Sequence, residues 1–134
     1  MSDSLPIEDR LAIADLLSAY ALLLDQGRLE DWLEVFWPDA SMEVPGQPAI
    51  HTHQGLREMA AGSPMGTHIA ASPLISPGAT ADEAIVEQAY IFRSSAKGWF
   101  SSGWYEDRVA KRDGRWRIIS RRVNYARRPP RSPS

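Results

Sequence analysis

The stretch from Ser4 to Phe36, SLPIEDRLAIADLLSAYALLLDQGRLEDWLEVF, decides how the rest of the chain can fold. It predicts a long helix that ends at Gly27, followed by a short second helix over residues 29–36. A repeat of about 3.6 residues predicts one buried stripe on the long helix, and an ionisable carboxylate, Asp25, ends that stripe. The members of the stripe are Ile7, Leu11, Ala14, Ser18, Leu22 and Asp25.

Asp25 has two interpretations at this point. The sequence Asp25-Gln26-Gly27-Arg28 is typical of a turn, in which an Asp side chain bonds only the local backbone. Alternatively, Asp25 is a carboxylate at the floor of an apolar pocket, where water is scarce. A carboxylate in such a place suits a base or the partner of a base. The stretch by itself leaves both interpretations open.

Length and composition favour one ordinary globular domain. The chain has 134 residues and predicts a single domain over residues 1–134, with a core of about 5–125. The Pro- and Ser-rich residues 126–134 predict a disordered tail. Arg121, Arg122, Arg127, Arg128 and Arg131 form a basic run, which we interpret as a solvated tail rather than a nucleic-acid site.

Charge and residue usage exclude several classes of function. The formal net charge of −2 gives no reason to expect binding to nucleic acid or to a membrane surface. The chain has no cysteine, which excludes disulfides, thiolate metal sites and a cysteine nucleophile. No secretion signal and no apolar run of about 20 residues is visible, so we expect a cytoplasmic protein with no membrane span.

The second half of the chain changes to a β pattern. A short strand is predicted at Ser41–Val44 and a third helix at Gln54–Ala61, before long strands with alternating apolar residues. The long strands are predicted at 67–75, 83–94, 98–111 and 116–125, with a hairpin turn at Asp113-Gly114. Helices followed by consecutive strands predict an α+β fold: a cone-shaped, curved antiparallel sheet wrapped around N-terminal helices, with an internal apolar pocket.

The three histidines differ in their surroundings. His51 and His53 lie in a polar segment that predicts a solvated loop, and no third metal ligand stands at a recognisable spacing from them. His68 opens a predicted strand, where the small neighbours Ala70 and Ser72 leave room beside the imidazole. The residues alone favour a catalytic histidine no more than a hydrogen-bonded core histidine.

The order of the framework residues resembles the SnoaL-like family of the nuclear transport factor 2-like superfamily. The resemblance covers about residues 5–125 and implies the cone-shaped α+β fold. The residues that carry the resemblance are Tyr20, the Asp25–Arg28 turn, Trp32, Phe36–Ala40, Gln54–Leu56, Thr67-His68, Gly103–Asp107 and Asp113–Ile118. This fold hosts many reactions, so the resemblance implies the fold more strongly than a substrate.

Within the family, the site residues are most similar to those of scytalone dehydratase, hexachlorocyclohexane dehydrochlorinase and bile acid dehydratases. In these enzymes an Asp at the end of the first helix orients a His that moves a proton. The resemblance implies that Asp25 and His68 form this pair and that Tyr20 donates a hydrogen bond to a substrate oxygen. It implies a cofactor-independent lyase, dehydratase or isomerase, with no metal or organic cofactor, acting on a small hydrophobic substrate that can be cyclic.

Two other functions remain open. The same fold serves as a non-catalytic binding or assembly domain in the small subunits of ring-hydroxylating dioxygenases, and an Asp–His pair can also activate water in a hydrolase. The second histidine of the scytalone dehydratase type has no counterpart here. The Arg–Asp–Asp set of limonene epoxide hydrolases is not evident, although Arg93, Asp107 and Arg121 are present.

Apolar residues around these positions predict the pocket wall and an interface. The candidate pocket residues are Trp32, Phe36, Met42, Val44, Met59, Val86, Tyr90 and Trp104. We also expect a homodimer or a higher homo-oligomer, formed through an outer sheet face that carries Tyr105 and Val109.

Overall fold

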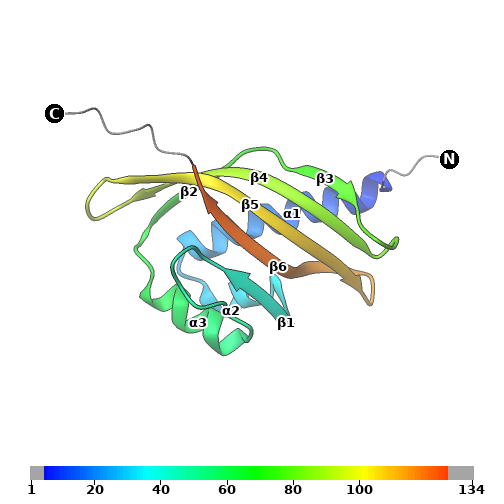
Figure 1. Cartoon of the computed structure of the whole chain (residues 1–134), viewed down its shortest axis with the longest axis horizontal. Helices are drawn as coiled ribbons and strands as arrows, with labels where there is room; N and C mark the ends of the chain where they lie inside the picture. Colours follow the sequence, from blue (N-terminus) through cyan, green and yellow to red (C-terminus); the bar gives the residue numbers. More distant parts are fainter. Residues whose placement is uncertain (1–4, 127–134) are drawn as a thin grey trace.

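The computed structural model describes residues 5–126 and has the α+β architecture predicted from the sequence. The helices are α1 (Ile7–Asp25), α2 (Leu29–Leu33) and α3 (His53–Gly62). The strands are β1 (Phe36–Glu43), β2 (Gly66–Ala70), β3 (Leu74–Pro77), β4 (Glu83–Ser94), β5 (Phe100–Arg112) and β6 (Arg115–Tyr125). Figure 1 shows the helices gathered along one side of a curved sheet. The predicted tail from residue 127 onward lies outside the described residues.

The six strands form one open sheet in the order β1-β6-β5-β4-β2, with β3 also paired to β4. All neighbours are antiparallel except β1, which runs parallel to β6. The strand predicted at 67–75 is divided into β2 and β3, because Pro73 lies between them and cannot donate a ladder hydrogen bond. The hairpin between β5 and β6 is confirmed, with positive φ angles of 51° at Asp113 and 77° at Gly114.

The second helix is shorter than predicted. It ends at Leu33, and Phe36 belongs to β1 instead. Phe36 stands beside Ile118 in the β1–β6 ladder, and Ile118 donates its backbone N–H to the carbonyl of Val35 at 2.9 Å. Pairing with the sheet therefore overrides the helical spacing of Leu29, Trp32, Leu33 and Phe36.

The buried side of α1 is not the predicted stripe. Ile7, Leu11 and Leu22 are 65%, 61% and 60% exposed. The side that packs into the core carries Ile13, Leu17 and Tyr20 instead. Because α1 is apolar on most of its circumference, periodicity alone does not select a side, and the sheet covers the side with the bulkier residues.

The two faces of the sheet are clearest on β4 and β5. The predicted alternation on β4 is confirmed, because Ala84, Val86, Gln88, Tyr90 and Phe92 are all buried. On β5 the prediction was wrong: Tyr105 and Val109 are 4% and 0% exposed and belong to the core, so neither is available to an interface. The charged Asp107 shares their face, which makes that face appear polar in the sequence.

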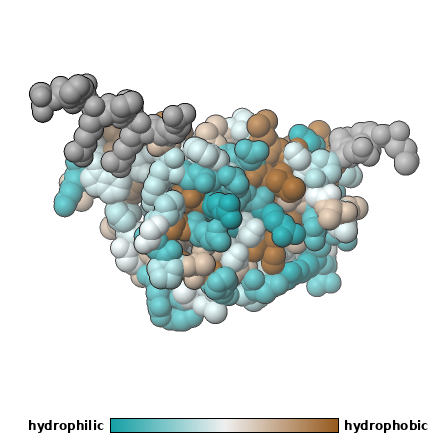
Figure 2. Space-filling view, in the orientation of Figure 1, coloured by the Kyte–Doolittle hydropathy of each residue, from teal (hydrophilic) through white to brown (hydrophobic). Residues whose placement is uncertain are grey.

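The exposed apolar residues of the outer face include Ile85, Ile91 and Trp104 on the long strands, Ile69 on β2 and Leu74 on β3. Figure 2 shows apolar, brown atoms among hydrophilic, teal ones over β3 and β4. None of the helices in the described part of the chain is long and apolar enough to cross a membrane.

A β-bulge on β6 determines which of its side chains enter the core. Arg108 stands opposite Ser120 and Val109 opposite Ile118, so Ile119 is an extra residue. The bulge inverts the alternation after Ile118 and turns Arg121 inward. Arg121 is 1% exposed, which contradicts its assignment to a solvated basic run. Arg122 points outward and donates a hydrogen bond to Glu43 at 2.8 Å.

Candidate active site

Asp25 is the last residue of α1, where the chain leaves the helix. Gly27 adopts a positive φ of 72°, a conformation that glycine reaches without strain and that ends the helix. The backbone N–H groups of Gln26 and Gly27 bond back to carbonyls of the last helical turn, at Leu22 and Leu24. The carboxylate of Asp25 has no donor to offer the last carbonyls of its own helix, and it reaches β2 instead.

The carboxylate of Asp25 accepts two hydrogen bonds from one residue, His68. The backbone N–H of His68 donates to Oδ2 at 2.7 Å, and its ring Nδ1–H donates to Oδ1 at 2.6 Å. The side chains of His68 and Asp25 are only 17% and 18% exposed. A carboxylate on Nδ1 fixes the tautomer of the ring, so Nε2 is the nitrogen that is left for a ligand.

The imidazole is held from its other side by the sheet. His68 stands opposite Phe92 in the β2–β4 ladder, and the two ring centres lie 4.6 Å apart. Phe92 in turn contacts Trp99, with ring centres 5.6 Å apart. The absence of a side chain at Gly66 leaves room for the ring of Phe92, because a Cβ atom at Gly66 would lie 2.5 Å from that ring.

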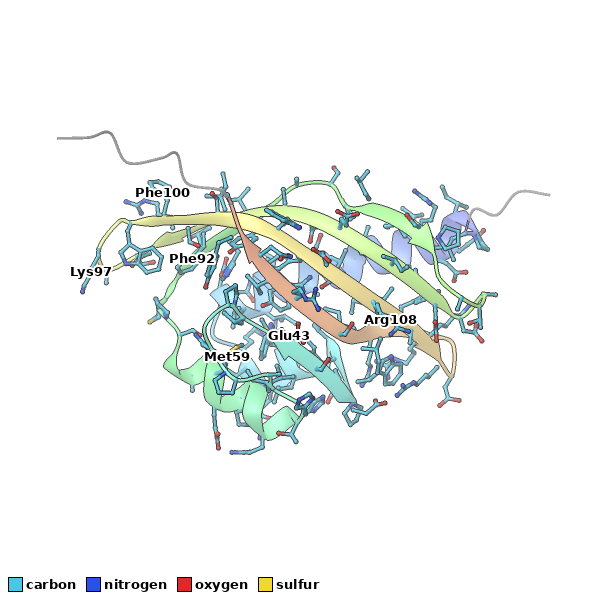
Figure 3. All side chains as sticks on the ribbon, in the orientation of Figure 1. Glu43, Met59, Phe92, Lys97, Phe100 and Arg108 are labelled. Atoms are coloured by element: carbon cyan, nitrogen blue, oxygen red, sulfur yellow. The ribbon has the colours of Figure 1, made fainter. Side chains whose placement is uncertain are left out.

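Asp25 and His68 line a cavity of about 810 Å³ between the helices and the concave face of the sheet. Four tyrosines, Tyr20, Tyr90, Tyr105 and Tyr125, also line it, together with many apolar side chains. Among the described residues that line the cavity, none is Lys, Arg or Glu. Figure 3 shows Met59 on α3, with Phe92 and Phe100 near the turn between β4 and β5; all three belong to the lining.

The structure separates the sequence-derived pocket candidates into three groups. Met42, Val44, Met59 and Tyr90 line the cavity. Trp32, Phe36 and Val86 are fully buried in the core and do not reach it. Trp104 lies on the outer face of the sheet, 36% exposed, where its indole donates to Glu106 at 3.3 Å.

Tyr20 enters the cavity wall from the C-terminal half of α1. Its ring packs between Trp32, Phe36 and Tyr105, with ring centres 5.6–5.9 Å away. Burial raises the pKa of the Tyr20 phenol, against the opposing effect of the nearby Arg121. The phenol is therefore neutral and can donate a hydrogen bond.

The ion pair between Arg121 and Asp107 was missed as part of the site. Both side chains are completely buried behind the tyrosines of the cavity wall. Charged residues in a strand normally indicate a solvated face. The bulge at Ile119 inverts the alternation of β6 and places Arg121 inside, and nothing in the sequence clearly indicates that bulge. The only available signal was the coexistence of Asp107 and Arg121 on neighbouring predicted strands.

The other two histidines lie apart from the cavity lining. His51 is exposed, whereas His53 begins α3 and donates its Nε2–H to the carbonyl of Phe36 at 3.0 Å, so the prediction of a solvated loop was wrong for His53. Within residues 5–126, no three His, Cys, Asp or Glu side chains are grouped so that they could hold a metal ion.

Comparisons with known proteins agree with this architecture. No curated protein sequence matches the chain. A variant of Rv3472, a protein of unknown function from Mycobacterium tuberculosis, is 30% identical; the match covers 91% of this chain and 79% of that one, with a TM-score of 0.81.

Two solved structures from Novosphingobium aromaticivorans share the fold at lower identity. A candidate scytalone dehydratase is 19% identical over 90% of this chain and 86% of its own, with a TM-score of 0.78. The β subunit of a candidate aromatic-ring-hydroxylating dioxygenase is 24% identical over 90% and 91%, with a TM-score of 0.75. The model of the SnoaL-like domain matches residues 6–122. The chain therefore belongs to the SnoaL-like family.

Proposed function

We propose that the cavity is the active site of a cofactor-independent lyase or dehydratase, or of an isomerase, in which His68 moves a proton. The observation that carries this proposal is the hydrogen bond between Asp25 and His68 at the wall of an apolar cavity. A carboxylate fixed on one ring nitrogen prepares the other nitrogen for proton exchange.

The two partners have different roles in this proposal. Asp25 orients the ring of His68 and stabilises the imidazolium that forms when Nε2 takes a proton. Tyr20 is the hydrogen-bond donor to a substrate oxygen, which its neutral, buried phenol suits. The substrate class that fits the lining is a small, largely apolar and uncharged molecule, with room for more than one ring in about 810 Å³.

An elimination by this site would proceed as follows for a β-hydroxy ketone. Nε2 of His68 takes the proton from the carbon next to the carbonyl, and the electron pair of that C–H bond forms the new C=C bond. The C–O bond at the β carbon breaks, and the departing oxygen takes the proton back from His68 to leave as water. An isomerase would use the same first step and return the proton to another carbon.

A non-catalytic binding or assembly domain and a water-activating hydrolase are the alternatives. The neighbouring dioxygenase subunit shares the fold, which is compatible with a binding domain. The place of His68 in the cavity wall favours the enzyme. A binding domain does not need an imidazole there whose tautomer is fixed by a carboxylate.

The test is a screen of one- and two-ring β-hydroxy ketones, in which elimination produces the ultraviolet absorbance of a conjugated enone. Wild-type protein, His68→Ala and the matched control His51→Ala are compared. We expect His68→Ala to lose about 10²–10⁴-fold in kcat/KM. His51→Ala should retain full activity, because His51 is exposed and lies outside the cavity lining.

A folded His68→Ala variant with wild-type turnover would remove the proposed role. Protein that binds these ketones tightly, and eliminates water from none of them, would support the binding domain instead.

A further inference from the structure

A permanently charged pair lies directly behind the tyrosines of the cavity wall. Arg121 on β6 stands opposite Asp107 on β5. The guanidinium donates through Nε to Oδ1 at 2.8 Å and through Nη2 to Oδ2 at 2.7 Å. Although burial alone would lower it, the carboxylate of Asp107 raises the pKa of Arg121 above its ordinary value. The guanidinium therefore keeps its charge.

The guanidinium lies against two aromatic rings that also line the cavity. Its carbon lies 4.0 Å from the ring centre of Tyr20 and 3.8 Å from that of Tyr105. Tyr105 also stacks on Tyr90, with ring centres 4.5 Å apart and planes inclined by 11°. All three tyrosines line the cavity, whereas Arg121 does not. The phenol rings therefore separate the positive charge of Arg121 from the cavity.

Fold stability does not explain why this pair is present. A buried ion pair can often be replaced by apolar residues of similar volume without loss of stability, because burying two charges offsets most of their attraction. The Nη1 group of Arg121 is buried and has no hydrogen-bond partner among the described residues, which is a further cost. A costly arrangement against a ligand cavity indicates a functional use.

We propose that Arg121, held by Asp107, is a positioning residue that makes Tyr20 and Tyr105 donors to a substrate oxygen that gains negative charge. This inference rests on the proposed function and deepens it, because it identifies the substrate class as a neutral carbonyl compound that becomes enolate-like during the reaction. A cation over the face of a phenol ring withdraws electron density and strengthens the O–H as a donor. Two rings that are already fixed against the guanidinium also need no reorganisation when charge develops.

The protonation of the two phenols agrees with that role. Burial raises the pKa of Tyr20 and of Tyr105, so both retain the proton that a donor needs. No cationic side chain among the described residues lines the cavity itself. The wall therefore suits an oxygen that becomes negative during the reaction better than a substrate that arrives with a negative charge.

The probe for this proposal is 4-nitrophenol, because its phenolate absorbs visible light and its phenol does not. The protein carries His68→Gln, so that no histidine in the cavity takes the proton and the result is independent of turnover by His68. The ion pair is removed as a unit with Arg121→Met and Asp107→Leu, since a single replacement would leave an unpaired buried charge. The ratio of bound phenolate to bound phenol is measured against pH, and thermal unfolding confirms the fold.

We expect the ratio to fall about tenfold or more when the pair is removed, which corresponds to one pKa unit or more of the bound probe. The matched control is Arg117→Met. Arg117 is also on β6 and lies over an aromatic ring, with its guanidinium carbon 4.7 Å from the ring centre of Trp37, but outside the cavity lining. It should leave the ratio unchanged.

The route of the effect is tested with Tyr20→Phe and Tyr105→Phe together. If Arg121 acts through the phenols, removing the ion pair in that background should no longer change the ratio. Arg121→Lys is the second variant in case the double replacement does not fold; it keeps a charge for Asp107, loses the planar guanidinium that lies against the two rings, and should also lower the ratio.

An unchanged ratio in a folded variant without the ion pair, or in Arg121→Lys, would overturn the proposal and make the pair structural. An effect of equal size without the phenols would overturn the route through Tyr20 and Tyr105.

Discussion

Replacing Asp25 with Asn is the sharpest perturbation of the pair, because it keeps the shape and changes the hydrogen-bond inventory. An Asn side chain has one acceptor oxygen and one donor NH₂, whereas Asp25 now accepts from both the backbone N–H and the Nδ1–H of His68. The backbone N–H cannot change its role, so the Asn oxygen must face it. The Asn NH₂ then faces Nδ1, which can accept only if its proton moves to Nε2.

The population of the two tautomers in the variant follows from the free-energy cost of keeping the proton on Nδ1. If the ring kept its proton on Nδ1, the buried backbone N–H or the ring N–H would face another donor, at a cost of about 1–3 kcal/mol. A difference of about 1.4 kcal/mol is a factor of ten, so most molecules should carry the inverted tautomer. The loss of one charge-assisted bond should lower the free energy of unfolding by only about 1 kcal/mol. Nε2 would then carry a proton and lose its function as a base, which should lower turnover by about 10³–10⁴-fold.

The assay is ¹⁵N NMR of protein labelled on histidine, with Asp25→Asn compared to wild type. Each ring nitrogen has a chemical shift that distinguishes N–H from a bare nitrogen, and His51 and His53 serve as internal references. We expect N–H at Nδ1 of His68 in wild type and at Nε2 in the variant. The same tautomer in both proteins would refute this reasoning.

Two further predictions concern the framework that holds the site. The indole of Trp116 donates to Asp9 at 3.0 Å; this bond, and the nearby Lys111, lower the pKa of Asp9. The stabilisation by Asp9 should therefore be complete above its unfolded pKa of about 3.9 and be lost as pH falls through the lower folded pKa. Urea unfolding should show that Asp9→Asn costs about 1 kcal/mol at neutral pH and progressively less in acid; a constant difference would argue against the ionised bond. A Cβ atom at Gly103 would collide with the backbone oxygen of Asn124. Gly103→Ala should thus separate β5 from β6 and cost about 2–4 kcal/mol in thermal unfolding, whereas Gly62→Ala, which meets no neighbouring atom, should cost little or nothing.

The sequence predicted those features whose cause is local. The alternation along β4, the Asp113-Gly114 turn and the end of α1 near Gly27 follow from side-chain period and turn chemistry. Asp25 was a candidate from its place at the end of the helical stripe and His68 from its place on a strand, but only the resemblance paired them, since 43 positions separate them and nothing in the spacing brings them together. Their hydrogen bond depends on how α1 packs against β2, which is a tertiary event.

The errors also have physical causes. The helix α1 has apolar residues on two sides, so its period is compatible with burying either Leu11 or Leu17, and only the sheet decides. On β6, the extra residue Ile119 inverts the alternation and buries Arg121, which a strict period of two places outside. On β5, Tyr105 and Val109 share their face with the charged Asp107, and a charge on a strand normally indicates a solvated face. Here Asp107 is buried because Arg121 is buried with it and donates to it.

The most direct measurement of the central claim is exchange of a carbon-bound proton with solvent. A two-ring ketone such as 1-decalone is incubated in D₂O with wild type, His68→Ala, Asp25→Asn and the control His51→Ala, and deuterium next to the carbonyl is followed by mass spectrometry. If His68 abstracts that proton, wild type and His51→Ala should incorporate deuterium at least about 100-fold faster than His68→Ala or Asp25→Asn. Incorporation at the same rate in all four proteins, equal to that in buffer alone, would contradict the account.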